Sequence, residues 1–135
     1  MNIDLLEQLK KHEGYRSHAY QDTVGIWTVG YGRNLQAMTV SNGQAESWLR
    51  EDILEAELDL MRNFPMVHGL SPNRQKVLIN MTFNLGITGL TKFKKMWLAL
   101  YDGDYEEVCD QMKDSKWYNQ VGLRAKELIK QMRKG

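Results

Sequence analysis

Apolar residues recur at intervals of three and four positions along most of this chain, which is the spacing of amphipathic α-helices. The first run occupies residues 3–9 and predicts a short helix that ends near Glu13 and Gly14, since glycine commonly follows a helix end. The next run follows Ser41 and Gln44, which form a capping-box pattern. It predicts a helix of about 20 residues that ends near Asn63.

Prolines and glycines separate the later helical runs. Pro65 and Gly69 interrupt the pattern, and Gly86 with Gly89 end the run that begins at residues 71–72. A further run begins at Phe93 and is expected to stop near residues 102–103. A short one covers residues 105–112, and the last begins at about residue 123. Residues 115–120 are expected to form a loop before this last helix.

The pattern changes between residues 19 and 35, where glycines and aromatic residues replace the helical period. Asp22 is followed by Gly25, Gly30, Gly32 and Asn34, which are residues typical of tight turns. This segment predicts a small, strongly turned antiparallel sheet. The fold class is therefore α+β and mostly helical, with a small antiparallel β lobe joined by a long helix to a helical lobe.

Composition is that of an ordinary globular protein, because 42% of the 135 residues are hydrophobic and 26% are charged. A net charge of +1 argues against a dedicated nucleic-acid binder. Residues 41–62 hold six acidic and two basic side chains, whereas residues 124–135 hold five basic and one acidic. Both runs fit solvated helix faces; the alternative for the second is a basic tail that approaches an anionic bacterial envelope.

The sequence shows neither an export signal nor a second cysteine for an internal disulfide. Cys109 is the single cysteine, lies in an apolar run and is expected to be a buried thiol. The N-terminal residues lack the basic and apolar regions of a signal peptide, and no run approaches the roughly 18 apolar residues of a spanning helix. If the target lies outside the membrane, another component is expected to release the protein.

Three residues form the strongest candidate for chemistry. Glu13 stands at a predicted helix C-terminus, where a carboxylate is electrostatically unfavourable and its presence points to a requirement. Asp22 and Thr28 follow within the predicted sheet. Two carboxylates and a hydroxyl on one folded-back segment suit glycosidic bond cleavage. Taken singly, each residue has a structural alternative. Glu13 could pair with a Lys or Arg, Asp22 could close a turn, and Thr28 could be present because threonine favours strands.

Other chemistry finds little support in the sequence. His12, His18 and His68 lack metal-site spacing, and there is no CxxC, phosphate-binding glycine loop or nucleophile-elbow serine, so we expect neither a metal nor a cofactor. Aromatic residues that suit sugar stacking, or alternatively the core, are Trp27, Tyr31, Trp117 and Tyr118.

Three blocks of sequence match those of a known family and occur in the same order: residues 13–32, residues 79–89, and residues 115–120 followed by 124–126. The match covers nearly the whole chain. On these blocks the chain resembles the phage-type lysozymes, glycoside hydrolase family 24. The resemblance implies a lysozyme-like fold and hydrolysis of the β-1,4 bond between N-acetylmuramic acid and N-acetylglucosamine in peptidoglycan, causing host cell lysis. By matching positions, Glu13 is the expected acid, Asp22 the carboxylate that positions water, and Thr28 the hydroxyl that holds this water.

The resemblance also implies an inverting reaction and an arginine, Arg124, that comes near the catalytic Glu. Arg33 departs from the family, since many relatives carry His there, and residues 35–41 are shorter than in the largest relatives, so the β lobe is trimmed. The expected substrate-binding residues are Tyr31, Phe83, Asn84, Asn119, Gln120 and Arg124.

The expected organisation is a single lysozyme domain over residues 1–135. Its β lobe covers about 13–45, its connecting helix about 42–63, and its helical lobe about 64–135 plus 1–12. Peptidoglycan glycan strands are the expected partner of a monomer made in the host bacterial cytoplasm. A holin is expected to release it through the inner membrane. Two alternatives stay open: a lytic transglycosylase, and a catalytically inactive wall-binding module.

Overall fold

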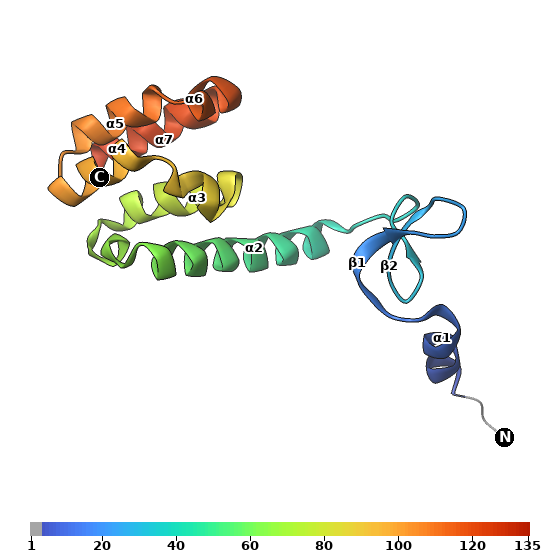
Figure 1. Ribbon diagram of the computed structural model, residues 1–135. Helices are drawn as coiled ribbons and strands as arrows, with labels where there is room; N and C mark the ends of the chain where they lie inside the picture. The colour runs from blue at the N-terminus through green and yellow to red at the C-terminus, as the bar shows by residue number, and fades with distance from the viewer. Residues whose placement is uncertain (1–3) are drawn as a thin grey trace. The chain divides into compact units, whose positions relative to one another are not determined.

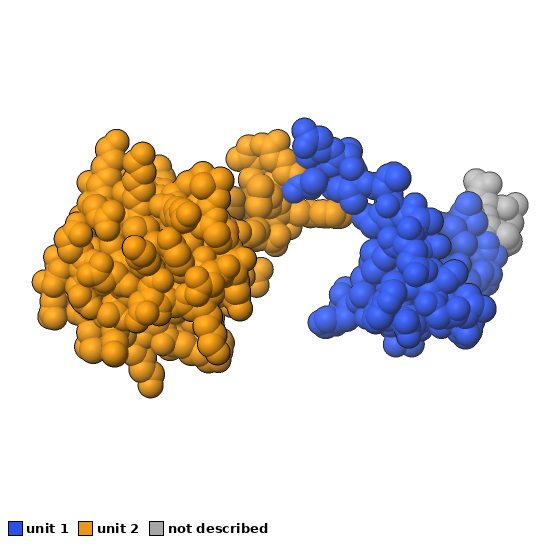
Figure 2. Space-filling model, turned by 90° about the horizontal axis from the view of Figure 1, so that it is seen from above, with its two compact units in different colours: residues 1–45 blue, residues 46–135 orange. Residues whose placement is uncertain are grey.

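Seven α-helices and one three-stranded sheet make up the residues that the structure, a computed structural model, describes, namely 4–135 (Figure 1). This confirms the mostly helical, lysozyme-like α+β fold with a small antiparallel sheet. The contacts within the chain define two compact units, residues 1–45 and residues 46–135 (Figure 2). The assignment of residues 1–12 to the helical lobe stays a prediction.

The first unit begins with helix α1, Leu5–Glu13. Asp4 caps it, since its side chain accepts a hydrogen bond from the backbone N–H of Glu7. Gly14 ends it with a φ of 72°, a conformation that favours glycine. The predicted helix end at Glu13 and Gly14 is confirmed, whereas the predicted first residue of the run, Ile3, lies outside the described residues.

An antiparallel sheet follows, with strands β1 (Arg16–Gln21), β2 (Trp27–Gly30) and β3 (Arg33–Asn34) in that order. It begins three residues before the predicted segment. Thr28 lies on the central strand, opposite Tyr20 of β1 and Asn34 of β3. Thr28 is the one buried side chain among residues 4–45, so the single buried position of this sheet holds a residue with a hydroxyl group.

Helix α2, Asn42–Asn63, confirms the predicted long helix at both ends. Its N-terminus is capped as expected, because Ser41 Oγ accepts the backbone N–H of Gln44 at 3.1 Å. A 3-10 turn, Pro65–Gly69, then occupies the predicted break.

The second unit continues with α3 (Pro72–Thr91), α4 (Lys94–Asp102), α5 (Tyr105–Lys113), α6 (Lys116–Val121) and α7 (Leu123–Lys134). The starts and ends of α4 and α5, and the start of α7, agree with the sequence pattern. In α3, Gly86 has a φ of 76° and a ψ of 159°, so it kinks the helix, which then resumes and runs to Thr91. The predicted end at Gly86 is therefore a kink.

The loop predicted at residues 115–120 is wrong, because the structure has helix α6 there. Ser115 caps this helix by accepting the backbone N–H of Tyr118 at 3.2 Å. Trp117 is 2% exposed, and burial of its indole stabilises a helix too short for the apolar period to show.

The hydrophobic core lies in the second unit, where α3, α4, α5 and α7 pack together. Phe64 stacks on Trp97 with ring centroids 3.6 Å apart, and the indole N–H of Trp97 donates to the carbonyl of Leu90 at 3.0 Å. Cys109 is buried in this core, as the sequence predicted. The largest fully buried side chains are Leu60, Val67, Val77, Leu78, Met81, Leu90, Met96, Val108, Cys109, Met112 and Met132.

Among residues 4–135, none of the helices has both the length and the apolar character that crossing a membrane requires.

Candidate functional site

The carboxylate of Glu13 lies against the turn between β2 and β3. A Cβ atom added to Gly32 would lie only 2.6 Å from Glu13 Oε2, closer than real Cβ contacts allow. Gly32 also has a φ of 74°, which disfavours any other residue. Within residues 4–45 no Lys or Arg forms an ion pair with Glu13. The end of α1 therefore places a carboxylate directly on the backbone of a sheet turn.

Asp22 occupies the other turn, between β1 and β2. Its Oδ1 accepts the backbone N–H groups of Val24 and Ile26, both at 2.9 Å. This is the turn-closing role that the residue type favours. Oδ2 accepts no hydrogen bond within residues 4–45, so one carboxylate oxygen fixes the turn while the other stays available to a ligand.

Thr28 is tied to the same turn as Asp22. Its Oγ1 donates to the carbonyl of Ile26 at 2.9 Å. Ile26 thus donates its N–H to Asp22 and accepts from Thr28, so its backbone sets the position of both side chains. Because Thr28 Oγ1 donates its proton to this carbonyl, the hydroxyl can only accept a hydrogen bond from a further ligand.

The two carboxylates flank strand β2, since Asp22 belongs to the turn before it and Glu13 lies against the turn after it. The four residues of this strand span about 10 Å. Such an arrangement brings two carboxyl groups to one short strand, and a pair of carboxyl groups is what acid–base cleavage of a glycosidic bond requires.

Tyr31 belongs to the same unit and lies at the turn that Glu13 contacts. Its ring centroid is 5.5 Å from that of Tyr15, and Lys10 Nζ lies 5.9 Å from it. A hollow of about 500 Å³ is lined by both tyrosines together with Arg16, Ser17, Val29, Gly30 and Arg33. An aromatic wall beside cationic side chains suits a sugar that carries a carboxylate.

The other predicted substrate-binding residues lie in the second unit. Asn84 Oδ1 accepts the indole N–H of Trp117 at 2.8 Å, so its carbonyl is already occupied. Arg124 donates from two guanidinium nitrogens to Asn80 Oδ1, at 2.7 and 3.0 Å, and so ties α7 to α3.

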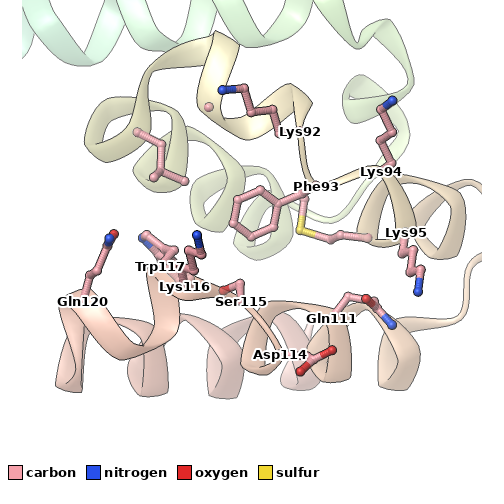
Figure 3. A pocket seen from close by; sticks show the side chains of 13 residues that line it. Lys92, Phe93, Lys94, Lys95, Gln111, Asp114, Ser115, Lys116, Trp117 and Gln120 are labelled. Atoms are coloured by element: carbon pink, nitrogen blue, oxygen red, sulfur yellow. The ribbon is translucent and has the colours of Figure 1, made fainter.

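Phe83 and Arg124 line a hollow of about 340 Å³ together with Leu49, Ile53, Lys76, Ile79 and Asn80. Gln120 is exposed and lines a different hollow of about 580 Å³ (Figure 3). Asn119 is exposed and makes no hydrogen bond through its side chain within residues 46–135. The predicted residues therefore form two groups, with Glu13, Asp22, Thr28 and Tyr31 in one unit and the remainder in the other.

Sequence reasoning missed Gly32, Ile26 and Asn80. Gly32 was read as a turn glycine, and its closeness to Glu13 has no local signal because the two residues lie far apart in sequence. Ile26 acts through its backbone alone. Asn80 lies in the second resemblance block, but only its contact with Arg124 gives it a role. Within residues 4–135 no group of three or more His, Cys, Asp or Glu side chains is arranged to hold a metal ion.

A family model and several individual proteins match this chain. A family model described as phage lysozyme matches residues 10–134. The endolysin of Acyrthosiphon pisum secondary endosymbiont phage 1 is 36% identical, over 70% of this chain and 68% of that protein. Peptidoglycan hydrolase gp36 of Pseudomonas phage phiKMV is 32% identical, over 93% of this chain.

A larger protein also matches. The pre-baseplate central spike protein Gp5 of Enterobacteria phage T4 is 26% identical over 92% of this chain. The chain spans 26% of the length of this spike protein and 15% of the length of gp36.

Proposed function

The chain belongs to the phage lysozyme family, and from this membership we propose that it is an endolysin that hydrolyses bacterial peptidoglycan. The bond cleaved is the β-1,4 linkage between N-acetylmuramic acid and N-acetylglucosamine. The observation that carries the proposal is the placement of Glu13 and Asp22 at the two ends of strand β2. Family membership alone would leave open whether the machinery for hydrolysis is present.

Each of the three residues has a separate role in the proposed reaction. Glu13 protonates the glycosidic oxygen as the bond to the anomeric carbon breaks. Asp22, through the oxygen that the turn leaves free, accepts a proton from water and stabilises positive charge on the sugar ring. Thr28 Oγ1 accepts a hydrogen bond from the same water, and the buried position of this side chain limits its motion.

We further propose that the reaction inverts the anomeric configuration, because Glu13 and Asp22 lie at the turns on either side of strand β2. Inverting glycosidases hold their carboxyl groups about 6.5–9.5 Å apart to admit a water, whereas retaining ones hold them about 5–5.5 Å apart. Glu13 and Asp22 belong to the segments beside opposite ends of a strand that spans about 10 Å, which leaves room for the wider class.

The second unit contributes the remaining contacts in this proposal. Phe83 and Arg124 bind the glycan strand from their shared hollow, and Gln120 and Asn119 contact it from α6. Asn84 acts by positioning Trp117. Tyr31, on the sheet, stacks on a sugar ring. The protein acts as a monomer, is made in the host cytoplasm, and reaches the wall through a holin to cause lysis.

A lytic transglycosylase is the second candidate, because it needs an acid such as Glu13 on the same scaffold. It needs no residue to activate water, and the anchored Asp22 and Thr28 favour hydrolysis. The match to a spike protein favours one further possibility. In it, the chain is the wall-degrading part of a larger assembly and catalyses the same reaction.

Product analysis tests the proposed reaction. Peptidoglycan freed of attached polymers is digested, reduced with borohydride and analysed by mass spectrometry, while proton NMR follows the anomer formed first. We expect reduced N-acetylmuramic acid ends and an initial α-anomer. Anhydro-muramic ends would replace the proposal by the transglycosylase, and reduced N-acetylglucosamine ends would show that the other bond is cleaved.

A further inference from the structure

The 580 Å³ hollow of the second unit includes Gln120, which the proposed hydrolysis uses, and also has features that this reaction does not use. It lies between the segment where α3 ends and α4 begins and the segment formed by α5 and α6 (Figure 3). Phe93 lies in the middle of this view. The apolar part of the lining consists of Leu85, Phe93, Met96 and Trp117.

Four of the residues that line this hollow are lysines, and we name them the lysine rim: Lys92, Lys94, Lys95 and Lys116. Asp114 is the one carboxylate in the lining, and within residues 46–135 no rim lysine forms an ion pair with it or with any other acidic side chain. The chain as a whole carries a net charge of only +1, so the rim is a local excess of unneutralised charge. Such an excess attracts anions.

Helix α4 strengthens the same positive field. Lys94 and Lys95 occupy its first turn, which contains no acidic residue, and the N-cap residue Phe93 makes no side-chain hydrogen bond to it. The N-terminus of a helix already carries partial positive charge, so lysines there are unfavourable unless an anion is nearby. The positive end of α4 therefore adds to the charge of Lys94 and Lys95.

Most of the groups that would give directional recognition in the hollow are already engaged, and the amide of Gln120 is the exception within residues 46–135. Ser115 Oγ donates to the carbonyl of Met112 at 2.7 Å and accepts from the backbone of Tyr118. Gln111 donates to Glu107 at 2.7 Å. With the indole N–H of Trp117 bound to Asn84, the free donors are mainly the ammonium groups of the rim. The hollow is therefore built to bind negative charge rather than one defined shape.

We propose that the lysine rim binds a flexible phosphodiester polymer with a polyol backbone, the chemistry of poly(glycerol phosphate). Lysine ammonium groups bind phosphate as point charges and need no fixed geometry. Several lysines along one hollow can contact successive phosphates of a single chain. Trp117 is 2% exposed, which leaves Phe93 as a lone stacking surface and disfavours single-stranded nucleic acid. The inference does not rest on the proposed hydrolysis.

Binding of fluorescent poly(glycerol phosphate), followed by anisotropy at low salt, tests the proposal. One variant changes the rim: Lys92→Gln, Lys94→Gln, Lys95→Gln and Lys116→Gln. The matched control removes the same charge from α5 and α7: Lys113→Gln, Lys126→Gln, Lys130→Gln and Lys134→Gln. We expect the rim variant to lose affinity about tenfold or more and the control less than about threefold, since the rim contributes most of the released counterions.

Equal losses in the two variants would show a general charge effect and overturn the proposal, as would no binding by the unaltered chain. Amide NMR shifts of the unaltered chain give a second measurement that is independent of variant folding. We expect the polymer to shift residues 92–96 and 115–117, and shifts elsewhere alone would contradict the site. Tighter binding of anionic vesicles or oligothymidine would assign the rim to a membrane or to nucleic acid instead. Hydrolysis is measured separately on polymer-free peptidoglycan, so the two proposals fail independently.

Discussion

Glu13 Oε2 lies where a side chain on Gly32 would have to be, 2.6 Å from the position of the missing Cβ. The proposed acid therefore depends on the lack of a side chain nineteen residues later in the chain. Because the nearest atom is the far end of a flexible side chain, a Cβ at this position would displace the carboxylate rather than the backbone. A side chain at Gly32 would therefore move the acid in addition to straining the backbone, and a second glycine of similar φ can measure the strain alone.

The Gly32→Ala variant is expected to fold but to lose about 100-fold in wall hydrolysis, since a shift of about 1 Å in a reacting group has this effect. Its φ of 74° also lowers the free energy of unfolding by about 1–2 kcal/mol. Gly103→Ala is the matched control, because Gly103 has a φ of 69° and nothing within 4 Å of its Cβ position. Clearing of purified peptidoglycan and chemical unfolding are measured on both. Equal loss of activity in the control would show that strain, not displacement of Glu13, is responsible.

Asp22→Asn separates the turn from the chemistry. The amide oxygen can still accept from Val24 and Ile26, so we expect the free energy of unfolding to change by less than about 0.5 kcal/mol. Hydrolysis should fall at least about 100-fold, because the charge that activates water is gone. Asp22→Ala removes both hydrogen bonds and should also lose about 1–3 kcal/mol of stability. An Asn variant with full activity would leave Asp22 with the turn role alone.

The hydrogen bond between Asn84 and Trp117 predicts a stability effect at a position expected from sequence to bind substrate. Asn84→Ala leaves the buried indole N–H without a partner and should cost about 1–3 kcal/mol in urea unfolding. Asn84→Asp keeps an acceptor oxygen and should lose less. If both variants were as stable as the unaltered chain, the hydrogen bond between Asn84 and Trp117 would make no contribution to stability.

Burial raises the pKa of the Cys109 thiol above its ordinary value of 9.0, because the core disfavours the thiolate. In the unfolded chain the thiol ionises first, so above pH 9 the folded state binds more protons than the unfolded one. The stability that this thiol contributes is therefore complete below pH 9 and is lost as pH rises towards the raised pKa. Unfolding measured from about pH 8 to pH 10.5 should show a steeper decline than in Cys109→Ala. Identical slopes would contradict a raised pKa.

Elements with a strong local signal were predictable from the sequence. The long helix α2 has a capping serine and a sustained apolar period, and its ends at Asn42 and Asn63 were found from these. Helix α6 was missed because six residues hold too few periods to show. It is stabilised by the buried Trp117, which is a tertiary effect.

The candidate site was predictable as a set of residue types but not as an arrangement. Glu13 was indicated by its unusual place at a helix end, and Asp22 by the turn that it closes. The contact of Glu13 with Gly32 and the shared backbone of Ile26 depend on how the chain folds back on itself. No residue pattern within a short window reports such contacts.

The most direct test of the account is wall clearing by Glu13→Gln beside Glu7→Gln, an equal change on the same helix away from Gly32. Both variants are first shown by circular dichroism to be folded. Glutamine keeps the size of Glu13 but has no acidic proton to give. The account predicts that the unaltered chain and Glu7→Gln clear peptidoglycan while Glu13→Gln loses at least about 100-fold. Full clearing by Glu13→Gln, or binding to the wall without clearing by the unaltered chain, would contradict it.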